Sequence, residues 1–202
     1  MKQIKLLLFV LGMVSFASSH AQTHPNIAAI SWEVAFPTNS NYLDKTSWAG
    51  GRVEYRRMVN KQFSIGAAIS WNSFEQYVGT KTYDDGHRGA VTTDMIREVY
   101  TLPITLTGHY YFQTDNKIFK PYVGIGLGGQ YAEQNAYFNI YGLTSNNWGF
   151  VARPEVGALL QFGRGVAGLV GVSYNIATNK NDEFDINGLK QFCVNIGIAG
   201  IF

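Results

Sequence analysis

The sequence predicts an all-β protein, an eight-stranded antiparallel up-and-down transmembrane β-barrel. Three observations carry this prediction. Eight segments alternate residue by residue between apolar side chains and small or polar ones, which is the period of a β-strand. The connections between these segments are alternately long and short, as in barrels that cross a membrane. Charged residues occupy the non-apolar face, so the polar face is the inner one.

The first two strands show the two faces most clearly. The first, over about 29–36, alternates around Trp32, and a loop over 37–47 rich in Pro, Asn, Ser and Asp follows it. The second runs from about Trp48 to Val59, with an apolar outer face and three successive charges on the other. These inward charges are Arg52, Glu54 and Arg56. A soluble barrel would bury its apolar face, whereas here the charged face has to point inward.

Strands three to eight repeat this alternation. We expect strands over about 63–72, 101–112, 121–131, 153–162, 170–176 and 192–202. The short connections are Asn60-Lys61, 113–117 and 163–165, and the long ones are 37–47, 75–94, 135–147 and 178–188. Pro103 falls on the inward face of its strand, where the missing N–H group predicts a bulge or kink. With both termini on the periplasmic side, the four long connections face outward.

The amino terminus has the pattern of an export signal. Lys2 and Lys5 form a basic region, an apolar run over 6–16 follows, and small residues precede a cleavage site after Ala21. The predicted organisation is a signal peptide over 1–21 and one barrel domain over 22–202.

The composition agrees with a membrane barrel and argues against a nucleic-acid-binding protein. Charged residues are 15% of the chain, against roughly 25% in soluble domains, while aromatics reach 14%. Without the two leader lysines, 14 basic residues balance 14 acidic ones, which argues against nucleic acid as a partner. Cys193 is the only cysteine, so neither an internal disulfide nor a cysteine metal site can form. We expect it to be a buried thiol on the lumen side.

Six charged residues are predicted to face the lumen and to form a network. They are Glu33, Arg52, Glu54, Arg56, Arg153 and Glu155. Unpaired charges inside a narrow barrel are costly, so pairing is expected. Because the first two strands are neighbours, we expect Glu33 to contact Arg52 or Arg56. The same residues fit a paired interior plug or, alternatively, a narrow ion path.

Two motifs suggest other chemistry and are weak. Gly124 to Gly129 satisfies the glycine spacing of a dinucleotide site, but no helical period follows. Gly124, Gly126 and Gly128 lie on the lumen face and are better explained as making room in the lumen. Residues 83–87, Tyr-Asp-Asp-Gly-His, place two acids and a histidine in an outward connection, which a solvated turn explains. His109, the only strand histidine, points inward with Tyr111 rather than a serine two residues on, so neither group makes a catalytic site.

The chain resembles the eight-stranded outer-membrane β-barrel superfamily of the OmpA/OmpX type, in particular the porin-family barrels common in Bacteroidetes. Leu102-Pro103-Ile104 before an aromatic strand end, the run from Lys120 to Gly126, and the terminal Phe202 carry this resemblance. It implies that Phe202 is the carboxy-terminal signal read by the barrel assembly machinery. Members of the superfamily serve as anchors, adhesion or defence factors, or parts of envelope machines.

These observations together indicate an outer-membrane protein of the Gram-negative envelope, exported through a cleaved signal peptide. We expect a non-enzymatic structural or interaction module with a plugged lumen and no cofactor. Its partners would be outer-membrane lipid, the assembly machinery during biogenesis, and envelope proteins that contact its outside loops. The alternatives are a small-solute pore, which needs a continuous wet lumen, and a lipid-modifying enzyme, which needs His, Ser and an acid clustered at one membrane interface.

Overall fold

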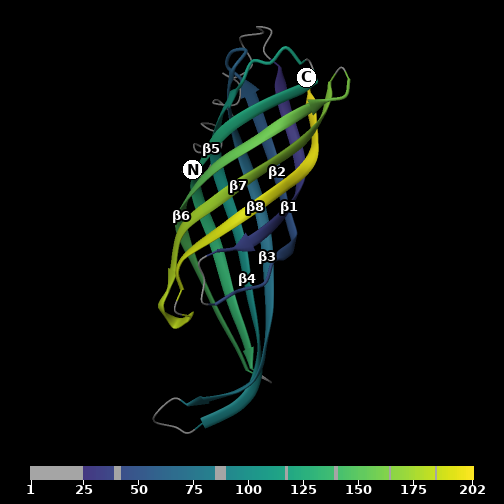
Figure 1. The fold of residues 1–202 in the computed structure, drawn as a ribbon. Coiled ribbons are helices and arrows are strands. Elements are labelled where there is room, and N and C mark those ends of the chain that lie inside the picture. The colour runs from purple at the N-terminus through teal and green to yellow at the C-terminus, as the bar shows by residue number, and fades with distance from the viewer. Residues whose placement is uncertain are drawn as a thin grey trace, which may run out of the picture.

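The computed structural model describes residues 25–38, 42–84, 90–116, 118–138, 141–163, 165–184 and 186–202. Eight antiparallel strands form one closed barrel in sequence order, which confirms the predicted fold class (Figure 1). The elements are β1 (Asn26–Pro37), β2 (Ser47–Met58), β3 (Phe63–Asp84), β4 (Ala90–Tyr111), β5 (Phe119–Phe138), β6 (Tyr141–Gln161), β7 (Val166–Asn181), the 3₁₀ turn η1 (Asp182–Phe184) and β8 (Ile186–Ile201). Among these described residues, no helix has the length and hydropathy to cross a membrane.

The first and last strands pair directly and close the barrel. Their register runs from Ile27 opposite Ile201 to Pro37 opposite Gln191. The backbone N–H of Asn26 donates to the carbonyl of Phe202 at 2.6 Å, and the N–H of Phe202 returns a bond to Asn26 at 3.0 Å. Every strand therefore has a neighbour on both sides, and the wall has no open edge at this level.

Exposed apolar side chains form a belt around the barrel, with a ring of aromatic residues at each border. We call the border toward the long strands upper and the border toward the short turns lower, although Figure 1 draws the short turns at the top. Near the short turns these aromatics are Phe63, Tyr110, Phe112, Phe119, Phe162 and Phe202, and toward the long strands they are Trp32, Trp48, Trp71, Tyr131 and Trp148. Neighbouring rings touch, as in Trp32 with Trp48 at 6.0 Å between centroids and Phe63 with Tyr110 at 4.9 Å. Aliphatic residues such as Ile125 fill the zone between the two aromatic rings. This arrangement is the apolar band with aromatic girdles of a transmembrane barrel.

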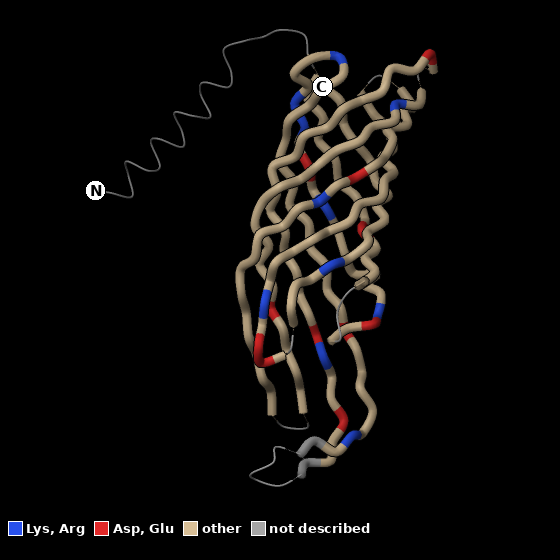
Figure 2. Tube along the Cα trace, turned by 60° about the vertical axis from the view of Figure 1, so that its left-hand side comes forward, with Lys and Arg blue, Asp and Glu red and all other residues tan. Residues whose placement is uncertain are grey.

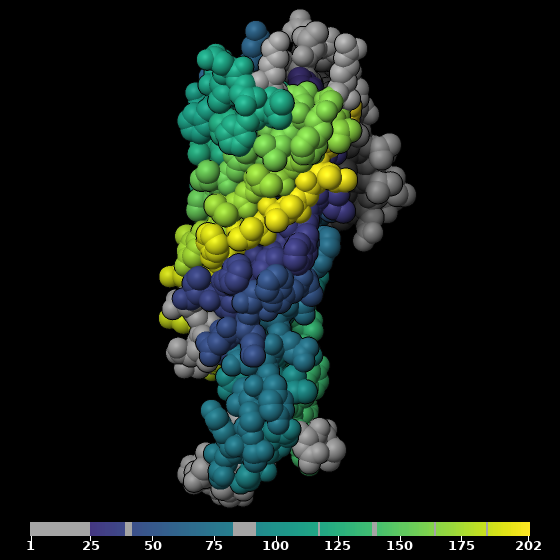
Figure 3. Space-filling view, turned by 45° about the vertical axis from the view of Figure 1, so that its right-hand side comes forward, coloured from purple at the N-terminus to yellow at the C-terminus, as the bar shows by residue number. Residues whose placement is uncertain are grey.

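Four strands are much longer than the sequence pattern predicted. Most of the predicted loop 75–94 is β-strand, because β3 continues to Asp84 and β4 begins at Ala90. The predicted loop 135–147 is likewise strand apart from the connection between β5 and β6. Beyond the upper aromatic ring the inner face of these strands stays buried, with Phe74, Val78 and Val99 among its side chains, whereas the outer face carries polar and charged residues between its aromatic ones. The outward apolar alternation that marks a membrane strand is therefore interrupted there. We call this part, residues 73–84, 90–100, 132–138 and 141–148, the extension (Figures 1 and 3).

Pro103, where a bulge or kink was predicted, lies in a strand that has no bulge at this position. Pairing of β3 with β4 keeps one register from Ile69 opposite Ile104 to Asn72 opposite Thr101, and Pro103 lies between them. On its other side Pro103 stands opposite Gln130 in an unbroken ladder. The missing N–H group thus interrupts hydrogen bonding toward β3 without inserting a residue, because the closed wall holds both neighbouring strands in place.

Short polar turns connect the strands at the end that carries both described termini. The side chain of Asn60 accepts hydrogen bonds from the backbone N–H groups of Gln62 and Phe63, each at 2.8 Å. Asn116 accepts one from Ile118 at 2.8 Å in the same manner. Gly165 has a φ of 93°, a left-handed conformation that suits glycine in the β6–β7 turn.

Apolar side chains close the lumen at the opposite end, below the extension. Tyr42 and Leu43, from the connection between β1 and β2, are buried in this outer apolar cluster. Its other members are Ala35, Phe74, Val99, Ala132, Val151, Ala177, Ile186, Leu189 and Cys193. Phe184 of η1 packs edge-on against Tyr42 at 5.2 Å between ring centroids. Burial raises the pKa of Tyr42 to about 12, so its hydroxyl stays protonated and donates to the carbonyl of Asn135 at 2.9 Å.

The position of Ile125 in the middle of the apolar belt gives a first prediction. Ile125→Lys places a charge midway between the two aromatic rings, where it should lower the free energy of unfolding by roughly 2–4 kcal/mol. The matched variant Asn146→Lys puts the same charge on the outward face of β6, on the extension, and should change stability little. Urea unfolding in lipid vesicles measures both, and equal losses would contradict the assigned belt.

Candidate functional site

The six charged residues singled out from the sequence all lie inside the barrel and are buried. Their side chains come from three strands, Glu33 from β1, Arg52, Glu54 and Arg56 from β2, and Arg153 and Glu155 from β6. Figure 2 shows charged positions along the barrel wall as well as at its ends. The six side chains form two groups at different heights, which we call the central cluster and the upper pair.

The central cluster joins two arginines to two glutamates across the lumen. Arg52 donates to Glu155 at 2.6 Å and lies 3.1 Å from Glu54. Arg56 lies 2.8 Å from Glu54 and 3.3 Å from Glu155. Each arginine therefore bridges the same two carboxylates, one from its own strand and one from the opposite wall. Side chains of the cluster are at most 5% exposed, so these contacts replace water as the solvation of four charges.

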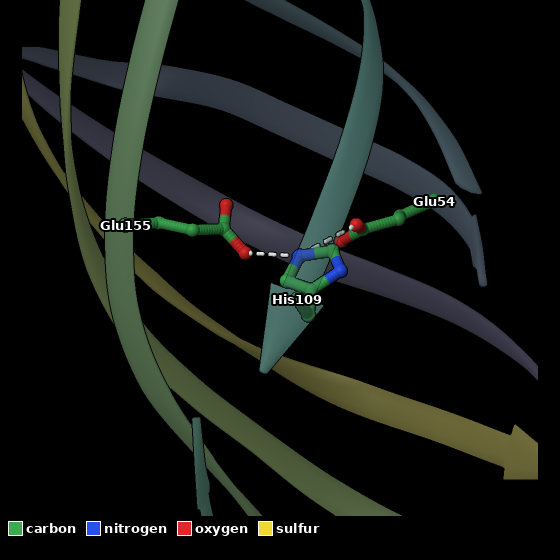
Figure 4. Close-up of side chains that lie close together, drawn as sticks. All are labelled: Glu54, His109 and Glu155. Atoms are coloured by element: carbon green, nitrogen blue, oxygen red, sulfur yellow. Dashed lines mark hydrogen bonds and ion pairs between the residues drawn. The ribbon is translucent and has the colours of Figure 1, made fainter. Parts of the chain in front are cut away.

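His109 of β4 completes the central cluster, although the sequence pattern did not predict that it belongs to this network. Its Nε2 atom lies 2.7 Å from Glu155 and 3.3 Å from Glu54, between the two carboxylates (Figure 4). The other ring nitrogen lies 3.4 Å from the hydroxyl of Ser64. The inward parity of His109 was visible in the sequence, but its height relative to β2 and β6 depends on strand register.

The upper pair corrects a predicted contact. Glu33 pairs with Arg153 across the lumen and not with Arg52 or Arg56. The reason is register, because Glu33 stands opposite Gly50 on β2, whereas Arg52 stands opposite Ser31, two residues further toward the short turns. Asn72 also donates to Glu33 at 2.7 Å.

Two further polar residues complete the upper pair. Ser70 accepts a hydrogen bond from Arg153 at 3.1 Å. The amide of Asn195, with its nitrogen toward Glu33, donates to that carboxylate at 2.7 Å and accepts from Arg153 at 3.3 Å. Both charges of the pair are thereby held by neutral side chains from other strands.

Two tyrosines connect the central cluster to a lower apolar cluster. Arg56 donates to the hydroxyls of Tyr111 at 3.2 Å and Tyr122 at 3.1 Å, and its guanidinium lies over the Tyr122 ring at 4.4 Å. Both tyrosines belong to the lower apolar cluster, whose other buried members are Ile27, Ala29, Leu159, Ala167, Leu169 and Ala199. The charged groups thus lie between apolar layers on both sides.

The glycines of β5 make room for this network. A Cβ atom on Gly124 would lie 2.5 Å from the His109 ring and 3.0 Å from the Glu155 side chain. The strand continues through Gly124 to Gly129 without a helix, so the glycine run has no dinucleotide-binding context. Its role in the lumen agrees with the interpretation from the sequence.

The central cluster contains a histidine and two carboxylates, which invites comparison with metal and acid–base sites. Ligand atoms of Glu54, His109 and Glu155 lie within 4.8 Å of one another, the one such group of three among the described residues. However, Arg52 and Arg56 already neutralise both carboxylates, and a divalent cation would have to displace them. The cavity against the cluster is about 10 Å³, the size of one water molecule. The arrangement therefore suits an ion-paired network better than a metal or substrate site.

A larger cavity opens at the short-turn end. Its volume is about 1160 Å³, and its lining includes Ile27, Met58, Tyr111 and Leu159 above a rim with Lys61 and Lys120. The lower apolar cluster forms its floor. This cavity ends before it reaches the charged residues.

Several expectations from the sequence lie outside the described residues. These are the signal peptide over 1–21 and most of the acidic and histidine-containing stretch 83–87. Cys193 is fully buried within the outer apolar cluster, as expected. Phe202 lies at the end of β8 on the outward face, in the lower aromatic ring.

The chain matches the family of the outer membrane protein beta-barrel domain over residues 6–199, and it belongs to this family. No protein among the curated ones that were compared matches the chain.

Solved structures with the same fold come from several bacteria. The attachment invasion locus protein Ail of Yersinia pestis, in complex with the heparin analogue sucrose octasulfate, shares 16% identity at a TM-score of 0.52, covering 90% of this chain and 100% of that chain. Neisserial surface protein A shares 16% identity at a TM-score of 0.53, covering 89% and 96%. OprG of Pseudomonas aeruginosa shares 15% identity at 0.50, covering 90% and 97%. At these identities the likeness concerns the fold.

The central cluster generates the second prediction. Replacing Arg52 and Arg56 together by Ala leaves Glu54 and Glu155 buried without cationic partners, which should lower the free energy of unfolding by about 3–5 kcal/mol. Lys61→Ala, in an exposed turn, removes a positive charge elsewhere and serves as the control. Urea titrations of the refolded proteins measure both. An unchanged midpoint in the double variant would mean that the arginines contribute no net pairing energy.

Proposed function

We propose that this protein is a closed, non-enzymatic outer-membrane barrel that acts as an interaction module. The observation that carries this proposal is the succession of layers inside the barrel. The charged network lies between the outer and the lower apolar clusters, with side chains meeting across the lumen at each level. A barrel of eight strands is just wide enough for its own side chains to fill it.

The same layers argue against a small-solute pore. An ion entering from either end would have to cross an apolar layer and then displace arginine–glutamate pairs held at 2.6–3.3 Å. Removing an ion from water into an apolar layer carries a large free-energy penalty. The cavity at the short-turn end stops at the floor formed by the lower apolar cluster.

An enzyme acting on lipid is also less well supported than a binding role. Such an enzyme needs its histidine, nucleophile and acid on a surface that lipid can reach. His109 instead faces the lumen, with a fully buried side chain and both neighbouring carboxylates held by arginines. The cavity lined by these carboxylates and arginines has a volume of about 10 Å³, the size of one water molecule.

The extension supports an interaction role. It continues four strands beyond the upper aromatic ring, and its outer face carries exposed side chains such as Tyr77 and Tyr137. With the termini in the periplasm, the extension lies outside the cell. Ail of Yersinia pestis, which shares the fold, has been solved with a heparin analogue. For this chain we propose protein partners in the envelope or beyond, in contact through this end.

Biogenesis completes the proposal. The leader over 1–21 directs export and is cleaved after Ala21, and the barrel assembly machinery reads Phe202 as the carboxy-terminal signal. Phe202 supports this role by its position, because its side chain is exposed on the outward face next to the closing seam. The belt then contacts outer-membrane lipid, and the balanced charge of the exported chain gives nucleic acid no basic surface.

The third prediction concerns conductance. Purified protein inserted into planar lipid bilayers should show no steady current, because each layer of the lumen is occupied by packed or paired side chains. The Arg52→Ala and Arg56→Ala double variant serves as the comparison, since it removes the cationic half of the central cluster. Reproducible single-channel openings from the unmodified protein would overturn the closed barrel in favour of the pore.

The fourth prediction concerns orientation. An epitope tag inserted at Asp85, in the connection between β3 and β4, should be labelled by antibody on intact cells. The same tag at Asn116, in the turn between β4 and β5, should be labelled only after the outer membrane is opened. Labelling of the Asn116 tag on intact cells would reverse the proposed orientation.

A further inference from the structure

We propose that the outward face of the extension is a docking surface for a partner protein that presents cationic and aromatic side chains together. This inference rests on the proposed function in one respect, namely that this end of the barrel faces outward. The surface combines an apolar strip with surrounding carboxylates, and each part points to one property of the partner.

The apolar strip consists of Tyr77, Ile96 and Tyr137 in direct register. Tyr77 of β3 stands opposite Ile96 of β4, and Ile96 stands opposite Tyr137 of β5. Their side chains are 62%, 38% and 42% exposed, respectively. Tyr77 lies six residues beyond Trp71 of the upper aromatic ring, about 20 Å along the strand. The strip is therefore outside the belt that lipid covers, and contiguous exposed apolar side chains of this kind mark interaction sites.

Carboxylates surround the strip on the same face. Glu75 stands directly opposite Glu98, and Glu133 lies on the next strand. Asp94 accepts a hydrogen bond from the hydroxyl of Tyr77 at 3.3 Å. Like charges directly opposite each other on neighbouring strands are destabilising, so the free protein keeps an electrostatic penalty at Glu75 and Glu98 that a cationic partner would remove.

No described residue on this face of the extension supplies the compensating positive charge. Arg97 belongs to the other face, where its guanidinium lies over the ring of Tyr42 at 4.8 Å. Lys81 pairs with Thr93, which shares the inner face with the buried Met95. The face is consequently acidic. It would repel an anionic ligand such as the sulfated one solved with Ail, and it would attract a cationic ligand.

The spacing of the carboxylates favours a protein surface over a single metal ion. Within the described chain, the one group of three potential metal ligands lies in the lumen and includes none of these acids. Glu133 is already held by Tyr131 at 3.1 Å and by the amide of Asn135 at 3.3 Å. Acids spread along three strands around an aromatic strip fit several arginine or lysine side chains interleaved with aromatic ones.

A peptide probe tests the proposal on the whole protein in phosphatidylcholine nanodiscs. The probe is a fluorescent hexapeptide of alternating arginine and tryptophan, compared with glutamate–tryptophan and arginine–glycine hexapeptides and with protein-free discs. Wild type should bind the arginine–tryptophan peptide in preference to both others. Sucrose octasulfate, added alone, should show no binding.

Two double variants should each weaken this binding about tenfold. Glu75→Gln with Glu98→Gln removes the opposed acids, and it should stay folded because it relieves a repulsion. Tyr77→Ser with Tyr137→Ser removes the aromatic part of the strip. The control, Asp182→Asn with Glu183→Gln, removes two acids from η1 at the same end and should bind like wild type.

Equal affinity of all variants, a preference for the glutamate–tryptophan peptide, or binding of sucrose octasulfate would each overturn the proposal. Folded state is checked for every variant by the heat-dependent shift in gel migration. Failure of the proposed function would be seen separately, as channel openings or as a reversed tag orientation, and neither result depends on the peptide measurements.

Discussion

The ion-paired cluster of Arg52, Glu54, Arg56 and Glu155 is the constraint on which the interior depends. Two guanidinium groups and two carboxylates are removed from water together, and each is tolerated only because the others lie within hydrogen-bond distance. Their strands, β2 and β6, are on opposite walls, so the cluster couples sheet regions that share no backbone ladder. This coupling constrains the width of the barrel, because the lumen must be narrow enough for the side chains of β2 and β6 to meet.

The surroundings of the cluster are adapted to it. Gly124 leaves space for His109, and the Tyr122 hydroxyl lies so close to Gly157 that a Cβ there would be 2.7 Å away. Apolar layers on both sides keep bulk water from the charges, which strengthens their attraction and raises the penalty for any unpaired group. The glycines, tyrosines and apolar layers therefore act as one unit with the ion pairs.

Strand parity could be predicted from the sequence because alternation is a local property. The inward positions of Arg52, Glu54 and Arg56 and the outward position of Ile125 follow from counting residues along one strand. The partner of Glu33 could not be predicted in this way, because it depends on the relative height of β1 and β6 across the lumen. Adjacent strands suggested Arg52, whereas the register sets Glu33 two residues higher.

The extension was missed for a related reason. Residues such as Thr82 and Thr144 favour strands by β-propensity, but outside the membrane the outer face of a strand does not require apolar side chains. The outward apolar face that located the membrane strands is interrupted there, because apolar residues such as Phe74 and Val78 face inward instead, and Asn-rich segments resembled loops. Pro103 shows the converse, since its local preference interrupts the pairing with β3, while the neighbouring strands of the closed wall keep one register and no bulge forms.

The closing seam between β1 and β8 has a consequence for how the chain folds. The contact between Asn26 and Phe202 joins the two ends of the described chain, so it has nearly the largest sequence separation among the described residues. Until the final strand is available, β1 exposes an unpaired edge, and none of the seven hairpin pairings can supply the missing partner. Folding with such non-local closure is intrinsically slow. The barrel can therefore close only after β8 has been made. Until then the unpaired edge of β1 can pair with other chains, and this is when the protein most needs protection from aggregation.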